Sequence, residues 1–223
     1  KAGMVHLFKN RDPKKDQSYF LQRLTQDHLQ HSIFPLAKWT KEETRKYAYE
    51  HKLPCKRNSE SQDLCFVPEG DYRDFLKREA SDRIESGEIV DTEGNHLGDH
   101  QGLPFYTIGQ RRGLGLENNE ALYVTDFDRQ NNRLVVGPEE ALYSTGLIAV
   151  DCNWITGYPP DNKELDVKIR YRADFVRAKV EARENKTRIE FLEPQKSVTP
   201  GQIAALYNGD RLLGGGVIDR KLG

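Results

Sequence analysis

In the second half of the chain, short runs of β-prone residues alternate with residues typical of turns. This alternation restricts the fold more than any other feature of the sequence. The change begins near Ile89. The residues Glu93-Gly94-Asn95 form a hairpin turn candidate, and Asn131-Asn132 separates two further strand-length runs. Runs of this kind continue from Leu147 to the C-terminus. This pattern predicts a small antiparallel β-barrel at the C-terminus.

The first third of the chain has a different, helical pattern. Apolar residues recur at roughly helical spacing over 16–34, with Asp16 as the predicted N-cap. Further on, Thr40 is followed three residues later by Glu43, which is the capping-box pattern of a helix start. This second helix is expected to end before Pro54. Its predicted buried positions are Tyr47, Ala48 and Leu53.

One capped helix with one or two strands cannot form a sheet that is covered on both faces. We therefore expect the first part to be the remnant of a larger N-terminal α/β domain, in a chain that begins at Lys1 without a methionine. The predicted fold class is multi-domain α+β. Its three expected domains are the α/β remnant with a cysteine loop (1–66), a small β-rich central domain (67–143) and the C-terminal antiparallel β-barrel (144–223).

The overall charge of −1 gives no general attraction to nucleic acid, but a local basic face is sufficient for RNA binding. The run 168–172 predicts a strand with Lys168, Arg170 and Arg172 on one face. A charged strand face is either solvated, or it contacts phosphate while an adjacent tyrosine stacks on a base. No apolar run is long enough to span a bilayer, and no leader is evident, so we expect no membrane contact.

The three cysteines, Cys55, Cys65 and Cys152, are too few for the disulfide framework of a secreted protein. No pair has the CxxC spacing, so we expect no metal site and a reducing, cytoplasmic compartment. Cys152 lies in an apolar run and is a predicted core residue. Cys65 follows the polar run 59–63 and precedes Phe66. It is either a partly buried structural cysteine or a reactive thiol on a loop.

Six segments then occur in a fixed order, and each is weakly specific alone. They are KDQSYFL, SESQDLCF, LGDHQGLPFYTIGQRRGLGL, RYR, VTPGQ and LLGGGVI. Together they closely resemble the C-terminal two-thirds of the bacterial tRNA-specific 2-thiouridylases. The resemblance runs through essentially the whole chain.

This resemblance implies an enzyme that thiolates the wobble uridine of the tRNAs for Lys, Glu and Gln. An N-terminal PP-loop domain is implied to use ATP to adenylate the C2 oxygen of that uridine. The cysteine matched by Cys65 is implied to carry a persulfide, received from a sulfur-relay donor protein. A second cysteine, in the N-terminal domain, is implied to attack this persulfide and form a disulfide. The implied tRNA-binding residues are Lys15, Asp16, Gln17, Arg170, Tyr171 and Gln202.

The chain also departs from the family pattern. It has no SGGxDS-type PP-loop, and no cysteine precedes Cys55. We therefore expect the ATP site and the partner thiol to lie outside this chain, which alone would be inactive and monomeric. Two other interpretations stay open: a tRNA-binding module in which Cys65 has no catalytic role, and an adaptor for a sulfur-carrier protein.

Overall fold

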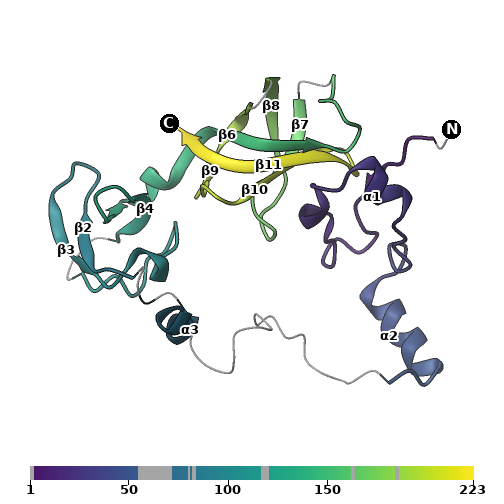
Figure 1. The fold of residues 1–223 in the computed structure, drawn as a ribbon, viewed down its shortest axis with the longest axis horizontal. Helices are drawn as coiled ribbons and strands as arrows, with labels where there is room; N and C mark the ends of the chain where they lie inside the picture. Colours follow the sequence, from purple (N-terminus) through teal and green to yellow (C-terminus); the bar gives the residue numbers. More distant parts are fainter. Residues whose placement is uncertain are drawn as a thin grey trace. The chain divides into compact units, whose positions relative to one another are not determined.

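A computed structural model describes residues 3–54, 72–79, 81, 84–116, 121–161, 164–183 and 186–223. The chain divides into two compact units (Figure 1). The first, which we call the barrel unit, joins Lys1–Lys56 to Ser144–Gly223, and the second, the central unit, is Arg57–Tyr143. No helix within the described ranges is long and apolar enough to cross a membrane.

The C-terminal part of the barrel unit is a closed antiparallel barrel of six strands, which confirms the predicted barrel. The strand order is β11-β10-β7-β8-β9-β6, and pairing between β6 and β11 closes the ring. Alternate side chains along the strands point inward to a core that includes Leu165, Val180 and Ile189. The strands are β6 (Tyr143–Trp154), β7 (Glu164–Lys168), β8 (Val176–Arg183), β9 (Lys186–Lys196), β10 (Ile203–Asn208) and β11 (Arg211–Leu222).

Three consecutive glycines in β11 allow this strand to lie close to both of its neighbours. A methyl group on Gly215 would lie 2.5 Å from the carbonyl oxygen of Ala204 in β10. On Gly216 it would lie 2.5 Å from the sulfur of Cys152 in β6. Figure 1 shows β11, in yellow, running beside both β6 and β10. The glycines of the LLGGGVI segment therefore serve barrel closure.

The N-terminal segment packs on the outside of this barrel. Its short strand β1 (Leu7–Phe8) pairs with the first residues of β11, Leu212 and Arg211. Tyr19 and Leu29 join Leu7, Tyr207 and Leu212 in one buried cluster. This cluster explains why residues from both ends of the chain form one compact unit.

The single helix predicted over 16–34 is wrong. The chain forms a 3-10 helix, η1 (Ser18–Leu21), and then a separate helix, α1 (Gln26–Gln30), which Thr25 caps. Asp16 does not cap the helix, because its carboxylate instead accepts hydrogen bonds from the backbone N–H groups of Asn10 and Ser18. These bonds hold the preceding loop in a conformation that a continuous helix cannot adopt.

The capping box predicted at Thr40 is confirmed. It begins α2 (Lys41–Glu50), and the side chains of Thr40 and Glu43 each accept a hydrogen bond from the other residue's backbone N–H. The predicted buried stripe is only partly correct. Ala48 is buried, whereas Tyr47 and Leu53 are exposed. The ring of Tyr47 contacts Trp39 and His51 rather than a core.

The central unit holds a four-stranded mixed sheet of order β3-β2-β5-β4, in which only β2 and β5 are parallel among the described pairings. Both predicted hairpin turns are confirmed, with positive φ angles at Gly94 and Asn132. Together with the barrel, this sheet confirms the predicted α+β class. The elements are α3 (Tyr72–Glu79), β2 (Gly87–Val90), β3 (His96–His100), η3 (Leu103–Phe105), β4 (Tyr123–Asp128), β5 (Arg133–Gly137) and η4 (Glu139–Leu142).

Candidate nucleic-acid interface

The loop that carries Lys15, Asp16 and Gln17 is organised around the Asp16 carboxylate. Asp16 is only 7% exposed. Its oxygens accept hydrogen bonds from the backbone N–H of Asn10 at 3.0 Å, the backbone N–H of Ser18 at 3.1 Å and the Ser18 hydroxyl at 2.7 Å. Lys15 is half-buried and Gln17 is exposed. The carboxylate therefore fixes the loop from inside, while Gln17 faces solvent.

Two buried tyrosines join this loop to the barrel. The Tyr19 hydroxyl donates a 3.0 Å hydrogen bond to the carbonyl oxygen of Ile203 in β10. The Tyr207 hydroxyl lies 3.0 Å from the hydroxyl of Ser18. Burial raises the pKa of both tyrosines above the ordinary value for this side chain. Both phenols therefore stay neutral at physiological pH and serve as hydrogen-bonding links.

Arg170 and Tyr171 lie just after β7, in a turn rather than in a strand. The predicted strand over 168–172 is wrong, because β7 ends at Lys168 and the Ala173 N–H donates to the Arg170 carbonyl oxygen at 3.1 Å. The Arg170 side chain is exposed, and its guanidinium donates to the Lys196 carbonyl oxygen at 3.2 Å. The turn thus presents the guanidinium at the surface, and one of its N–H donors is already used in the hydrogen bond to Lys196.

Tyr171 packs against the N-terminal segment. Its ring centroid lies 4.8 Å from that of Phe20 and 6.3 Å from that of Tyr19. Arg170 is close enough to affect Tyr19 electrostatically. Burial raises the pKa of the Tyr19 hydroxyl, and the positive charge of Arg170 partly offsets this rise. The turn after β7 and the segment after residue 17 therefore meet at Tyr19.

Gln202 lies immediately before β10, next to Ile203, whose carbonyl oxygen accepts the Tyr19 hydrogen bond. Its N–H donates to the Thr199 carbonyl oxygen at 3.2 Å, and its own carbonyl accepts from the Ile218 N–H at 2.8 Å. Gly201, with φ of +88°, makes the tight turn before it. The Gln202 side chain is exposed. The structure therefore gathers the three groups of predicted tRNA-binding residues around one tyrosine, Tyr19.

This gathering has the chemistry of an RNA-binding surface. Arg170 offers a planar fork of donors that suits phosphate, and Gln17 and Gln202 offer both donors and acceptors. Tyr171 supplies a ring next to that cation. Asp16 is the exception among the six predicted residues, since its side chain faces the protein.

The structure describes one of the three cysteines, Cys152. Cys65 and Cys55 lie outside the described residues. Cys152 in β6 is half-buried against the barrel core, and burial raises the pKa of its thiol. A thiol with a raised pKa is a poor nucleophile at neutral pH, which agrees with the predicted structural role of Cys152.

Within the described ranges, no group of three or more His, Cys, Asp or Glu side chains is arranged so that it could hold a metal ion. His96 and His100 in β3 have the His-x3-His spacing, so the premise that the sequence lacks such a histidine pair is wrong. His100 is buried, however, and its ring nitrogens contact the Asn132 carbonyl oxygen and the Gly102 N–H, both at 3.0 Å. That ring therefore serves to hold the sheet together.

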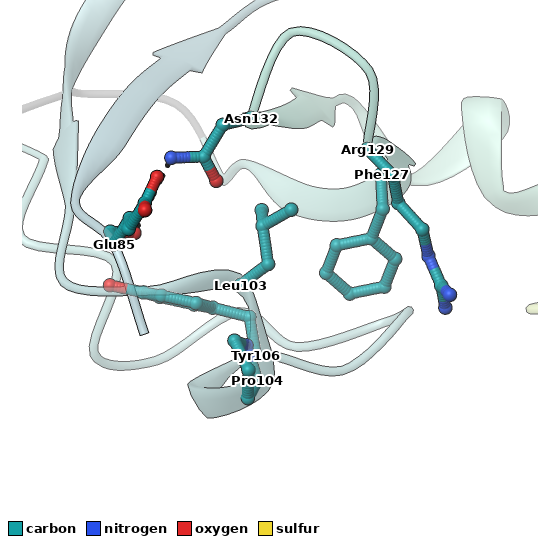
Figure 2. Close-up of a pocket in the computed structure, with 7 residues that line it drawn as sticks. All are labelled: Glu85, Leu103, Pro104, Tyr106, Phe127, Arg129 and Asn132. Carbon is teal, nitrogen blue, oxygen red and sulfur yellow. Dashed lines mark hydrogen bonds between the residues drawn. The ribbon is translucent and has the colours of Figure 1, made fainter. Parts of the chain in front are cut away.

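An open cavity of about 660 Å³ lies in the central unit (Figure 2). Tyr106 and Phe127 form part of its lining, and Glu85 lies across it from Arg129. Asn132 donates to the backbone carbonyl oxygens of Glu85 and Ser86 at 3.4 and 2.9 Å. With one guanidinium opposite one carboxylate among the described lining residues, this cavity does not have the run of cations that phosphate groups require.

Two residues beside the candidate interface, Lys9 and Phe175, are not among the predicted tRNA-binding residues. The Lys9 ammonium lies 3.7 Å from the ring centroid of Phe175 and 5.1 Å from that of Tyr207. No spacing rule links residues so far apart in the chain. The interleaving of basic and aromatic residues in KIRYRADFVR is the signal that could have found Phe175.

Three protein-family models match three consecutive parts of the chain. A tRNA methyl transferase HUP domain matches residues 1–69, and a tRNA methyl transferase PRC-barrel domain matches residues 73–138. An aminomethyltransferase beta-barrel domain matches residues 144–218. The three matches together include most of the chain, and the third coincides with the six-stranded barrel.

Individual relatives cover nearly the whole chain. The tRNA-specific 2-thiouridylase MnmA of Carboxydothermus hydrogenoformans is 44% identical over 99% of the chain and 61% of that relative. The corresponding proteins of Thermoanaerobacter sp. (MnmA 2) and Geotalea uraniireducens are 46% and 45% identical, over 97% and 99% of the chain and 60% and 59% of the relatives. The chain therefore spans about 60% of the length of these curated relatives.

Proposed function

The chain belongs to the tRNA-specific 2-thiouridylase family, and from this premise we propose that it is part of a tRNA-uridine 2-sulfurtransferase. The reaction replaces the C2 oxygen of the wobble uridine with sulfur, and ATP is consumed to AMP. The observation that carries the proposal is identity of 44–46% along 97–99% of the chain. The proposed substrates are the tRNAs for Lys, Glu and Gln, in the cytoplasm, with the protein acting as a monomer.

We propose that the chain contributes to three domains of the enzyme. Residues 1–66 complete the ATP-binding domain, most of which lies outside this chain, 67–143 form the central domain, and 144–223 form the barrel. Family-model boundaries near residues 69–73 and 138–144 support this division. The ATP site itself would be built by the part of the protein that precedes this chain.

We place tRNA on the surface around Tyr19. Arg170 would contact phosphate, Tyr171 would stack on a base, and Gln202, Gln17 and Lys15 would donate hydrogen bonds to the backbone or to base edges. Asp16 would act differently, as a positioning residue, because its carboxylate is already bonded to Asn10 and Ser18. The convergence of these residues on one tyrosine supports a single binding surface.

The proposed sulfur carrier is Cys65, as a persulfide received from a sulfur-relay protein. Adenylation converts the C2 oxygen into a leaving group. The terminal persulfide sulfur then attacks C2, AMP departs, and a second thiol from the preceding domain attacks the Cys65 sulfur. The S–S bond breaks, its electron pair stays on the sulfur now bound to the base, and a protein disulfide forms. An external thiol must reduce that disulfide before the next turnover.

The test uses the full-length protein with ATP, tRNA and a persulfide source, and quantifies 2-thiouridine by mass spectrometry of digested tRNA. Cys65→Ser is expected to abolish the product, whereas Cys152→Ser, which changes a half-buried thiol of the barrel, is expected to leave it. Cys55→Ser is likewise expected to retain activity. Full product from Cys65→Ser would refute the carrier role and leave a tRNA-binding module or a sulfur-carrier adaptor as the better interpretation.

A further inference from the structure

Three aromatic rings and two lysines form a connected group on the barrel unit, which we call the aromatic–cation row. Phe20 contacts Tyr171 at 4.8 Å between ring centroids. The Lys168 ammonium lies 5.9 Å from the Tyr171 ring and 4.9 Å from the Phe175 ring. Lys9 lies 3.7 Å from the centroid of Phe175. The row therefore runs from Phe20 through Tyr171 and Lys168 to Phe175 and Lys9.

The row is built by three separate parts of the fold, and contacts with neighbouring residues position Phe175 and Lys9. Phe20 belongs to η1, and Phe175 precedes β8. The Phe175 ring stands edge-on against Tyr207 of β10, with centroids 5.0 Å apart and planes at 86°. Lys9 is fixed by its backbone N–H, which donates to the Asp210 carbonyl oxygen at 2.8 Å, and its ammonium lies 3.9 Å from the Asp210 carboxylate. Phe175 and Lys9 are thus positioned by the fold itself.

Two of these rings are open to solvent. Phe20 is 53% exposed and Phe175 is 37% exposed. A single exposed aromatic residue needs no explanation. Two exposed rings grouped with a half-buried tyrosine, with lysine ammonium groups near the rings and Arg170 next to Tyr171 in the chain, have the composition of a surface that binds single-stranded nucleic acid.

We propose that Phe20 and Phe175 are stacking platforms for unpaired bases of tRNA, and that Lys168, whose ammonium lies near the Tyr171 and Phe175 rings, contacts the phosphates. This inference rests on the proposed function, because it takes tRNA as the ligand. It extends the surface to residues for which the family resemblance gave no role. Unstacked bases in RNA loops bind aromatic faces irrespective of sequence, and adjacent cations neutralise the backbone.

The occupant is RNA rather than a protein segment because cations accompany the rings. Lys168 is half-buried, and its ammonium lies 5.9 Å from the Tyr171 ring centroid and 4.9 Å from that of Phe175, so a positive charge accompanies these rings. A protein partner that relied on apolar contact alone would gain nothing from this charge. A polyanion with flat apolar bases matches both features of the row.

The experiment measures binding of the 223-residue chain to a transcript of the tRNA for Glu and to a fully paired RNA duplex of equal length. The variants are Phe20→Leu, Phe175→Leu and the double variant, since leucine keeps apolar volume and removes the π face. The control is Tyr158→Leu, which changes another exposed ring (59%) of the barrel unit. Thermal melts confirm that each variant is folded.

Each Phe→Leu variant is expected to weaken tRNA binding by roughly 5- to 150-fold, the range for one base–aromatic stack. The slope of affinity against salt should not change, because stacking releases no counterions. Duplex binding and the Tyr158→Leu control should stay within about twofold of the unmodified chain. Ultraviolet cross-linking to tRNA should label the tryptic peptides 16–23 and 173–177, which contain Phe20 and Phe175.

The possible failures can be told apart. Unchanged tRNA affinity in both Phe variants, with binding by the unmodified chain intact, would overturn this inference and leave the proposed function standing. An equal loss for the duplex would also overturn it, because a paired RNA offers no free base to stack. Absence of tRNA binding by the unmodified chain would overturn the proposed function and this inference together.

Discussion

The hydroxyl of Tyr19 donates a 3.0 Å hydrogen bond to the carbonyl oxygen of Ile203, and this bond joins the N-terminal segment to the barrel at the point where the candidate interface converges. Tyr19 is buried, and its ring also faces Tyr171. One side chain therefore holds the segment 15–17, the turn at 170–171 and the start of β10 in a fixed relation. The interface depends on this packing as much as on the residues that would touch RNA.

Removal of the Tyr19 hydroxyl should weaken this junction. Tyr19→Phe keeps the ring but leaves the Ile203 carbonyl without this donor, so the free energy of unfolding should fall by about 1 kcal/mol. Urea unfolding followed by fluorescence measures the change. Tyr158→Phe, at an exposed ring, is the matched control and should show none. Equal stability of Tyr19→Phe and the unmodified chain would show that the bond does not hold the segment.

Asp16 should matter for loop position rather than for direct RNA contact. Asp16→Ala removes the acceptor for two backbone N–H groups and one hydroxyl in a buried place, which should cost about 1–3 kcal/mol of stability. At temperatures where Asp16→Ala is partly unfolded, its affinity for tRNA should fall. At a lower temperature, where this variant is fully folded, most of that affinity should return. Asp27→Ala, on exposed α1, serves as the control. A loss of affinity without any loss of stability would instead indicate direct contact.

The glycines of β11 should be intolerant of a side chain. A methyl group at Gly215 would lie 2.5 Å from the Ala204 carbonyl oxygen and 3.1 Å from the Ala205 Cα, so Gly215→Ala must displace backbone in β10. The expected loss of stability is about 1–3 kcal/mol or more. Gly3→Ala, where nothing lies within 4 Å, should be neutral. Thermal unfolding monitored by circular dichroism compares the two variants.

Alkaline pH should loosen the junction between the N-terminal segment and the barrel. Burial raises the pKa of Tyr19 and Tyr207, so the folded chain holds these two protons more tightly than the unfolded chain does. Their contribution is complete below the ordinary tyrosine pKa of about 10, and it is lost as the pH rises through the folded-state values. Urea unfolding between about pH 9 and pH 11 should show falling stability, less steeply in Tyr207→Phe. If stability fell equally steeply with pH in the unmodified chain and in Tyr207→Phe, the pH dependence could not be assigned to Tyr207.

The barrel and both hairpins could be predicted because their signals are local. Turn residues such as Gly94 and Asn132 adopt positive φ angles that few side chains tolerate, and the capping box at Thr40 is a pattern of four residues. The helix predicted from Asp16 failed because a buried carboxylate organised the backbone into a loop instead. The strand predicted through Arg172 failed because nothing in KIRYR marks the turn after Lys168.

The candidate site was predicted through resemblance, whereas its assembly was not predictable from residue patterns. The contact of Lys9 with Phe175 and the bond from Tyr19 to Ile203 link residues from opposite ends of the chain. Such contacts arise only when the N-terminal segment packs on the closed barrel. The roles of Lys15, Asp16, Gln17, Arg170, Tyr171, Gln202 and Cys65 stay predictions.

The most direct test of the account measures tRNA affinity against salt concentration for the unmodified chain, Arg170→Ala and Arg183→Ala. Arg183 is an exposed arginine at the end of β8, paired with Glu181 at 3.7 Å and outside the proposed surface. Arg170→Ala is expected to weaken binding and to reduce the salt slope by about 1, whereas Arg183→Ala is expected to change neither. Equal effects of the two substitutions, or no salt-dependent binding by the unmodified chain, would contradict the placement of tRNA on this surface.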